Sequence, residues 1–192
     1  MTAPASGPVV AVVLAAGAGH RFGGQAPKLL APLDGRPLVT WAIDAALDAG
    51  IGEVMVVEGA VDLGGVIPAG VTRVRNERWG DGVATSLGSA LGAVREREVA
   101  AIVVGLGDQP RVPPIAWRAV AARTDLPIAV ATYGGRRGHP VRLAREIWDL
   151  LPARGDEGAR ALMRARPELV AEVACVGDPT DVDTLEDLGR WS

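Results

Sequence analysis

The chain has little of what several classes of protein require, and each shortage argues against one of them. Among its 192 residues there is a single cysteine, Cys175, so no disulfide can form within the chain. Cys175 lies in the apolar run 173–176, where we expect a buried thiol rather than a nucleophile. Only two histidines accompany it, so we do not expect a zinc site. This cysteine usage fits a reducing compartment, and we expect the protein to be cytoplasmic.

Long apolar segments and basic runs are also missing. No apolar stretch reaches the roughly 18 residues of a membrane span, and MTAPASGP lacks the basic start and apolar core of a secretion signal. The 20 lysines and arginines form no basic run and the net charge is −3, so neither a membrane nor a nucleic acid is expected as partner. We expect a disordered tail at 1–7 and a single domain at 8–192, long enough to bury a core.

What the chain does have is a succession of short apolar runs and helical patterns. Residues 9–16 and 100–106 are almost wholly apolar, which is typical of strands covered on both faces. Strands that alternate with helices predict a mostly parallel sheet between two helical layers, a three-layer α/β sandwich. The predicted strands are 9–16, 53–58, 71–75, 100–106, 127–132 and 169–176. The predicted helices are 37–49, 82–97, 113–123, 143–151, 158–165 and 184–190.

A glycine-rich segment follows the first predicted strand. Residues 12–35 read VVLAAGAGHRFGGQAPKLLAPLDG. The segment has no Gly-Lys pair of a P-loop, and Phe22 stands where a dinucleotide-binding fingerprint has its third glycine. The backbone N–H groups of such a loop can surround phosphate oxygens, and Arg21 and Lys28 suit a polyphosphate. The alternative is an ordinary strand-to-helix turn with a solvated arginine and lysine.

Two further polar clusters follow predicted strands. Residues 107–110 come after the strand 100–106, and residues 177–184 come after the strand 169–176. Ligands of parallel sheets bind beyond the carboxyl ends of the strands. The three clusters are therefore expected to meet in one site.

Taken together, these motifs resemble the nucleotidyltransferases of the glycosyltransferase-A-like, Rossmann-like fold. Within that group the chain is most similar to the molybdenum cofactor cytidylyltransferase (MocA-like) branch, which is related to the guanylyltransferase MobA. The resemblance covers residues 9–189, although the segment 24–27 makes the arginine-to-lysine spacing about two residues longer than is usual. The motifs that carry it are LAAGAGHRFG (14–23), KLL (28–30), NERW (76–79) with Gly82 and Ser86, GDQP (107–110), GHPV (138–141), GDEGAR (155–160) and DVDT (181–184).

The resemblance implies a reaction. A phosphate of an acceptor attacks the α-phosphorus of a nucleoside triphosphate, here CTP, and pyrophosphate leaves. The implied acceptor is molybdopterin or another phosphorylated small molecule, and a molybdenum enzyme or its chaperone would be the protein partner. Two alternatives stay open: a transferase of this fold that uses GTP, or that acts on a sugar phosphate or an isoprenoid precursor, and a silent cofactor-binding chaperone.

The resemblance also implies roles around the phosphates. Arg21, Lys28 and Asp108 are the expected catalytic residues, and the backbone of Gly17 and Gly19 would hold the β- and γ-phosphates. Asp108 is the expected ligand of Mg²⁺, which prefers carboxylate and water oxygens. As the second ligand we favour Asp183 over Asp181. Thr184 is predicted to cap the last helix, with an acidic residue three positions on.

The remaining roles concern the base and the acceptor. Backbone groups of Leu14, Ala15 and Ala16 would meet the base edge, Gly82 would permit close approach, and Ser86 would offer its hydroxyl. The alternative for Ser86 is helix capping. On the acceptor side we expect His139, Asp156 and Glu157. For these residues the alternatives are a structural turn histidine and a charged run that faces solvent.

Overall fold

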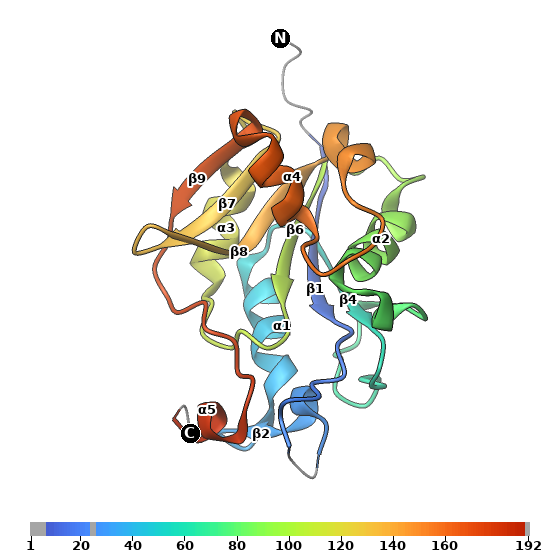
Figure 1. Ribbon diagram of the computed structural model, residues 1–192, viewed down its shortest axis with the longest axis vertical. Helices are drawn as coiled ribbons and strands as arrows, with labels where there is room; N and C mark the ends of the chain where they lie inside the picture. Colours follow the sequence, from blue (N-terminus) through green and yellow to red (C-terminus); the bar gives the residue numbers. More distant parts are fainter. Residues whose placement is uncertain (1–6, 24–25, 191–192) are drawn as a thin grey trace.

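The protein is organised around one twisted sheet. The computed structural model describes residues 7–23 and 26–190, so the predicted tail lies, apart from Gly7, outside the described residues. Within them, a seven-stranded sheet has the order β5-β4-β1-β6-β8-β7-β9 (Figure 1). Its strands are β1 (Val9–Ala15), β4 (Glu53–Glu58), β5 (Thr72–Arg75), β6 (Ala101–Leu106), β7 (Ile128–Tyr133), β8 (Arg136–Ala144) and β9 (Val170–Ala174). The paired strands run parallel, except that β8 is antiparallel to both of its neighbours.

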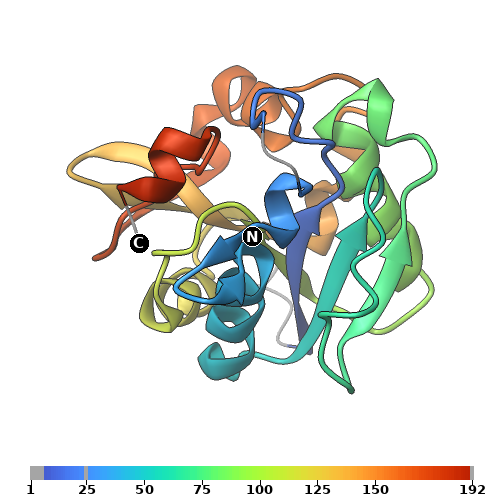
Figure 2. The ribbon, with the colours of Figure 1, turned by 90° about the horizontal axis from the view of Figure 1, so that it is seen from below.

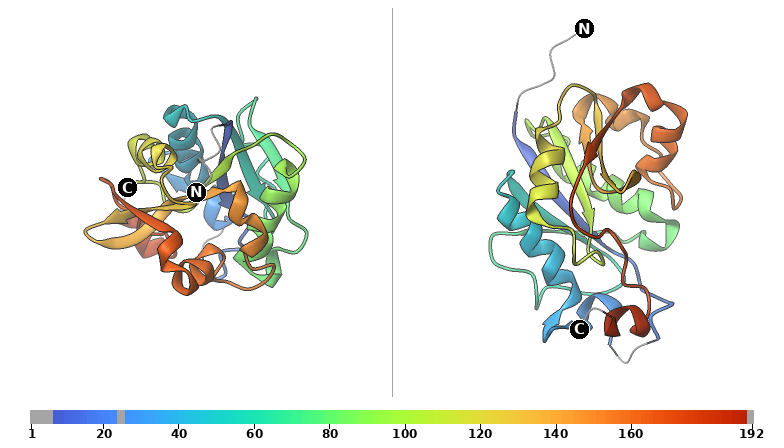
Figure 3. Two further views of the ribbon diagram at one scale, coloured as in Figure 1. Left: turned by 90° about the horizontal axis from the view of Figure 1, so that it is seen from above. Right: turned by 90° about the vertical axis from the view of Figure 1, so that its left-hand side faces the viewer.

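Helices cover both faces of this sheet (Figure 3). On one face α1 (Leu38–Ala49) and α3 (Pro114–Ala122) bury alternate residues of β1, such as Ala11 and Val13. On the other face α2 (Val83–Val94) and α4 (Ala159–Ala165) bury the intervening residues, such as Val10 and Val12. The predicted three-layer α/β sandwich with a mostly parallel sheet is therefore confirmed. No helix in the described part of the chain combines the length and apolar character needed to cross a bilayer.

The C-terminal segment returns to the glycine-rich loop. After β9 the chain runs down one side of the sheet to α5 (Leu185–Gly189), beside the hairpin of β2 (Pro32–Leu33) and β3 (Arg36–Pro37) (Figure 1). A small apolar cluster joins Phe22 of the loop to Leu38 of α1 and Val182 of the C-terminal segment. The predicted cap of α5 is confirmed, because Thr184 and Asp187 form a capping box. This packing places the C-terminal segment beside the glycine-rich loop.

The structure corrects the sequence prediction around residues 138–151. The predicted helix 143–151 is wrong: residues up to Ala144 belong to β8, and a 3₁₀ helix, Arg145–Leu150, follows. Pro140 argues against an inner strand because it cannot donate to the ladder. The β7–β8 pairing accommodates it through an irregularity: Val130 faces Val141, and Thr132 already faces Arg137, so residues 138–140 bulge out of register. A further difference is that Cys175, expected to be buried, is half-buried, and its partial burial raises the pKa of its thiol.

Candidate active site

The glycine-rich loop folds back over the lysine that follows it. Gly19 adopts φ = +65°, a left-handed conformation that favours glycine, and its carbonyl accepts a hydrogen bond from the N–H of Phe22 at 2.9 Å. A Cβ atom at Gly19 would stand only 2.7 Å from Cβ of Lys28, whereas one at Gly17 would meet nothing within 4 Å. Gly19 is thus required for close passage over Lys28, and Gly17 borders open space. Of the segment 24–27, residues 24 and 25 lie outside the described part.

Three segments that are distant in sequence bring two cations and two carboxylates together, with Lys28 between the carboxylates. Lys28 Nζ donates to Asp108 Oδ2 at 2.6 Å and to Asp183 Oδ1 at 3.1 Å, and Arg21 Nη2 lies 2.9 Å from Asp183 Oδ2. Asp108 follows β6, and Asp183 lies in the C-terminal segment. The Lys28 side chain is 10% exposed and that of Arg21 is 79% exposed. Burial alone would lower the pKa of Lys28, but the two carboxylates outweigh it and raise the pKa, so the ammonium stays charged.

The structure treats the two candidate metal ligands of the C-terminal segment differently. Asp183 shares Lys28 with Asp108, whereas Asp181 Oδ1 accepts a hydrogen bond from Gln109 Nε2 at 2.7 Å. Burial and the neighbouring charges of Asp108 and Asp183 raise the pKa of Asp181. Within residues 7–23 and 26–190, no group of three or more His, Cys, Asp or Glu side chains is arranged to hold a metal ion. A metal here would rest on few protein ligands, which is usual for Mg²⁺.

Two hollows flank this charged cluster at the carboxyl edge of the sheet, the edge seen in Figure 2. The smaller, of about 400 Å³, is lined by Lys28, by the described parts of the glycine-rich loop and by Ala60 and Val61 after β4. The larger, of about 630 Å³, has an apolar floor and a charged rim. Its floor includes Leu14, Leu87, Val104, Leu106, Val130, Val141, Leu143 and Met163, and its rim includes Arg21, Arg137, His139, Asp156, Glu157, Arg160, Arg164 and Asp181.

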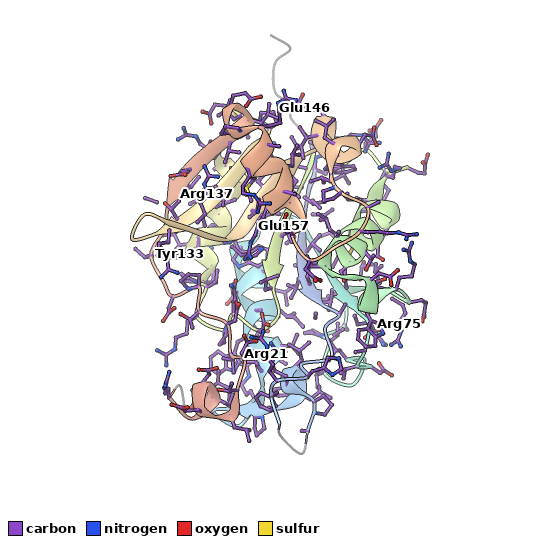
Figure 4. All side chains as sticks on the ribbon, viewed as in Figure 1. Arg21, Arg75, Tyr133, Arg137, Glu146 and Glu157 are labelled. Atoms are coloured by element: carbon purple, nitrogen blue, oxygen red, sulfur yellow. The ribbon has the colours of Figure 1, made fainter. Side chains whose placement is uncertain are left out.

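The predicted acceptor residues do come together in the larger hollow. His139, Asp156 and Glu157 all line it; Figure 4 labels Glu157, together with Arg21 and Arg137 of the same rim. Glu157 Oε2 accepts from Arg164 at 2.6 Å, which holds this part of the rim in place. His139 lies in β8 rather than in a turn, and its backbone carbonyl accepts from Tyr133 Oη at 2.7 Å. Their contact with an acceptor stays a prediction.

The His139 ring is held as the neutral imidazole. Its Nδ1 is buried without a hydrogen-bond partner among the described residues. Burial, and to a lesser extent the charge of Arg160, lowers the pKa of His139 to about 4. A neutral ring that faces an acidic acceptor can serve as a hydrogen-bond donor or acceptor without adding charge.

This shifted pKa makes stability depend on pH in a defined window. Unfolded chains bind a proton on histidine near pH 6.5, whereas the folded protein resists protonation of His139 down to about pH 4. The stabilisation is therefore complete above pH 6.5 and is lost as the pH falls from 6.5 toward 4. We expect the melting temperature of the wild type to fall more steeply over this window than that of His139→Gln. The same dependence of melting temperature on pH in the two proteins would contradict this prediction.

Two of the predicted base-binding residues, Ser86 and Gly82, make contacts within the protein itself. Ser86 is 4% exposed and lies within α2, whose N-cap is Gly82, so its hydroxyl does not cap the helix. Instead Ser86 Oγ accepts from Asn76 Nδ2 at 2.9 Å. Gly82 does permit a close approach, but to the chain itself: an added Cβ would lie 2.5 Å from the carbonyl carbon of Gly155.

The backbone groups expected to meet the base are partly used within the fold. The carbonyl of Leu14 accepts from the N–H of Gly107 at 2.9 Å, and that of Ala16 accepts from the N–H of Ala60 at 3.0 Å. Ala15 pairs with Glu58 in the sheet. A carbonyl oxygen keeps a second lone pair, so contact with a base remains a prediction.

Two buried amide side chains, those of Asn76 and Gln109, were not predicted as site residues. Asn76 donates to both Thr85 and Ser86, and Gln109 donates to Asp181 and to the carbonyl of Pro179. Both residues stand inside the motifs quoted for the family resemblance. Their burial, which would have shown that they hold other residues in place, becomes visible only in the fold.

Comparison with known proteins identifies the family of this chain. The sequence profile of the MobA-like NTP transferase domain matches residues 11–172. The nicotine blue oxidoreductase of Paenarthrobacter nicotinovorans is 33% identical over 197 residues, which is 95% of each chain. The crystal structure of Rv0371c from Mycobacterium tuberculosis H37Rv superposes with a TM-score of 0.82 at 32% identity, over 95% of this chain and 96% of that one.

A second crystal structure of that protein contains a metal. Rv0371c in complex with manganese superposes with a TM-score of 0.79 at 30% identity, over 96% of this chain and 98% of that one. A divalent cation is thus bound by a relative of this chain. With the fold, the glycine-rich loop and the profile match in agreement, the chain belongs to the family of MobA-like NTP transferases.

Proposed function

We propose that the protein transfers CMP from CTP to a phosphorylated acceptor of the molybdopterin type and releases pyrophosphate. The observation that carries the proposal is the cluster of Lys28, Arg21, Asp108 and Asp183 between a hollow of the glycine-rich loop and a larger cleft. The smaller hollow suits the triphosphate, and the larger suits the acceptor. We further propose that the protein acts in the cytoplasm and hands its product to a molybdenum enzyme or its chaperone.

In the proposed reaction an oxygen of the acceptor phosphate attacks the α-phosphorus, and the bond between that phosphorus and the bridging oxygen of the β-phosphate breaks. The N–H groups near Gly17 and Gly19 would hold phosphate oxygens, and Lys28 and Arg21 would neutralise charge that develops on the leaving pyrophosphate. To do so, both cations must exchange carboxylate oxygens for phosphate oxygens. Arg21, at 79% exposure, is free to swing.

The carboxylates fit a divalent cation. Asp108 and Asp183 both direct an oxygen at one ammonium, at 2.6 and 3.1 Å, so their geometry already accommodates a positive charge. Carboxylate oxygens are hard ligands of the kind that Mg²⁺ prefers. We propose that these two residues hold Mg²⁺, which when bound would act as a Lewis acid and offset the negative charge of the phosphates.

The larger cleft supports an acceptor that has a flat apolar part and an anionic group. Side chains such as Leu14, Val104 and Leu143 give it an apolar floor, while Arg21, Arg137 and Arg160 stand on its rim. A ring system would cover the floor, and a phosphate would pair with the rim. A small polyhydroxylated sugar phosphate would leave that floor uncovered.

The choice of nucleotide provides the direct test. With Mg²⁺ and a molybdopterin acceptor present, we expect CTP to give faster pyrophosphate release than GTP, ATP or UTP. In EDTA we expect no pyrophosphate release. CTP with Mg²⁺ should also raise the melting temperature most, since a ligand that binds only the folded state stabilises it. Equal or better use of GTP would assign the chain to the guanylyltransferases. No release with any nucleotide, despite binding, would favour a silent chaperone.

The relationship to nicotine blue oxidoreductase favours a second candidate function. The apolar floor of the larger cleft could hold an aromatic molecule for reduction instead of nucleotidyl transfer. Against it stands Phe22, at the position of the third glycine of a dinucleotide fingerprint. Consumption of a reduced nicotinamide dinucleotide with an aromatic dye, in the absence of CTP, would support this candidate.

A further inference from the structure

The side chain of Gln109 has one orientation that its surroundings permit. It is 5% exposed and directly follows Asp108. Its Nε2 atom donates to the carbonyl of Pro179 and to Asp181 Oδ1, each at 2.7 Å. A carbonyl and a carboxylate can only accept, so the nitrogen of the amide must face them, and both of its hydrogens are used.

Gln109 thereby holds the segment that carries Asp183. The N–H of Val182 donates to the carbonyl of Asp108 at 3.0 Å, and the Val182 side chain is fully buried. On the far side of Asp183, the capping box of Thr184 and Asp187 fixes the start of α5. The segment 179–182 is thus attached to Asp108 and Gln109, which follow β6, through Pro179, Asp181 and Val182. Asp183 comes next and is held opposite Asp108.

The hydrogen bond from Gln109 to Asp181 gives the two nearby aspartates, Asp181 and Asp183, different surroundings. Asp181 and Asp183 stand two positions apart, and Asp181 lies close enough to both Asp108 and Asp183 for their charges to interact. Asp181 is bound by Gln109 and lines the larger cleft, whereas Asp183 contacts Lys28 and Arg21. The amide hydrogen also offsets the repulsion that Asp181 would feel from the other carboxylates.

We propose that Gln109 is a positioning residue that decides which aspartate completes the metal site: it keeps Asp181 at the acceptor cleft and leaves Asp183 to pair with Asp108. The inference rests on the proposed function, because it takes Asp108 and Asp183 as the residues that hold the cation. It assigns Asp181 a separate task, that of presenting a carboxylate to the acceptor.

Binding of Mn²⁺ alone, followed by the electron paramagnetic resonance of the free ion, tests the assignment without turnover. With Gln109 intact, Asp183→Asn should weaken Mn²⁺ binding at least about tenfold, whereas Asp181→Asn should change it less than about twofold. Asn keeps the acceptor that Gln109 needs, so Asp181→Asn is expected to fold normally. Equal losses for the two variants would overturn the inference.

The Gln109→Met variant supplies the complementary measurement. It keeps the length of the side chain but removes both donors, so the segment that carries Asp183 loses its hydrogen bonds to Gln109. We expect Mn²⁺ affinity to fall about tenfold, the lower end of the loss seen when a residue that orients metal ligands is removed. In this background Asp181→Asn should weaken Mn²⁺ binding further, because the released Asp181 now helps to hold the ion. Unchanged Mn²⁺ affinity in Gln109→Met, with a normal melting temperature, would overturn the inference.

Two controls separate this inference from the proposed function. Thr132→Val removes a partly buried hydrogen bond to the carbonyl of Val173, away from the site, and should leave Mn²⁺ affinity unchanged. Asp108→Asn should abolish Mn²⁺ binding. If the wild type binds no Mn²⁺, or if Asp108→Asn binds it equally well, the metal site of the proposed function is wrong, and the inference is wrong with it. If that control holds and the two aspartates behave alike, only the role of Gln109 fails.

Discussion

Replacing Asp108 by alanine should lower pyrophosphate release from CTP at least about 100-fold, the loss seen when one preorganised electrostatic group is removed from an active site. The variant should fold, because the Asp108 side chain pairs with Lys28 at a strand end and is 22% exposed. Its backbone carbonyl, which accepts from Val182, survives the substitution. Lys28 would keep Asp183 as its partner. Steady-state pyrophosphate release, with circular dichroism melting in parallel, measures both effects.

Asp149→Ala is the matched control for Asp108→Ala. Asp149 also forms an ion pair, with Arg95 at 2.8 Å, but it lies on the exposed surface of the 3₁₀ helix Arg145–Leu150. Exposed pairs of this kind contribute about 0–1 kcal/mol to stability, so this variant should keep its activity and nearly all of its stability. Substantial turnover by Asp108→Ala would remove Asp108 from the proposed site.

Gly19→Val should reduce CTP turnover by about 100-fold or more. Its Cβ would stand 2.7 Å from Cβ of Lys28, an atom next to the backbone that cannot rotate away. Either the loop or Lys28 must move, and a displacement of about 1 Å at a positioned group can cost about 100-fold in rate. Valine at φ = +65° is also strained, which should lower stability by about 1–2 kcal/mol. Turnover at saturating CTP and the melting temperature separate the two effects.

Gly35→Val reproduces the strain of Gly19→Val without the clash. Gly35 adopts φ = +77° in the turn between β2 and β3, and a Cβ there would meet nothing within 4 Å. We expect Gly35→Val to lower the melting temperature through strain alone and to keep its turnover, whereas Gly19→Val should lower the melting temperature at least as much and lose its turnover. If Gly19→Val keeps its turnover as well, the loop is an ordinary turn and does not hold the triphosphate.

The layers of the fold could be predicted because they follow from local patterns. Continuous apolar runs such as Ala101–Leu106 have one stable place, the interior of a covered sheet. The helical period of Leu38–Ala49 and the cap at Thr184 are equally local. Around Pro140 the local signals misled, because an antiparallel inner strand containing proline is tolerated only through the bulge that β7 and β8 form together.

The residue types of the site were also evident from the sequence. Glycines that free the backbone, an arginine and a lysine after them, and aspartates after apolar strands already predict a site for a phosphorylated ligand. Their chemistry depends on side-chain type, and their common location depends on the parallel order of strands. Both can be inferred without coordinates, and the match to the MobA-like family agrees with them.

Which of these residues contact one another was decided by the tertiary structure. Lys28 meets Asp108 and Asp183 across 80 and 155 positions of sequence, and Gln109 reaches Asp181 across 72. No local pattern encodes such pairs, because they depend on how the C-terminal segment packs against the end of β6 through Val182. Local patterns of residues thus specify the layers and the kinds of groups at the sheet edge. It is the packing of distant segments that makes Asp183, and not Asp181, face Asp108 across Lys28.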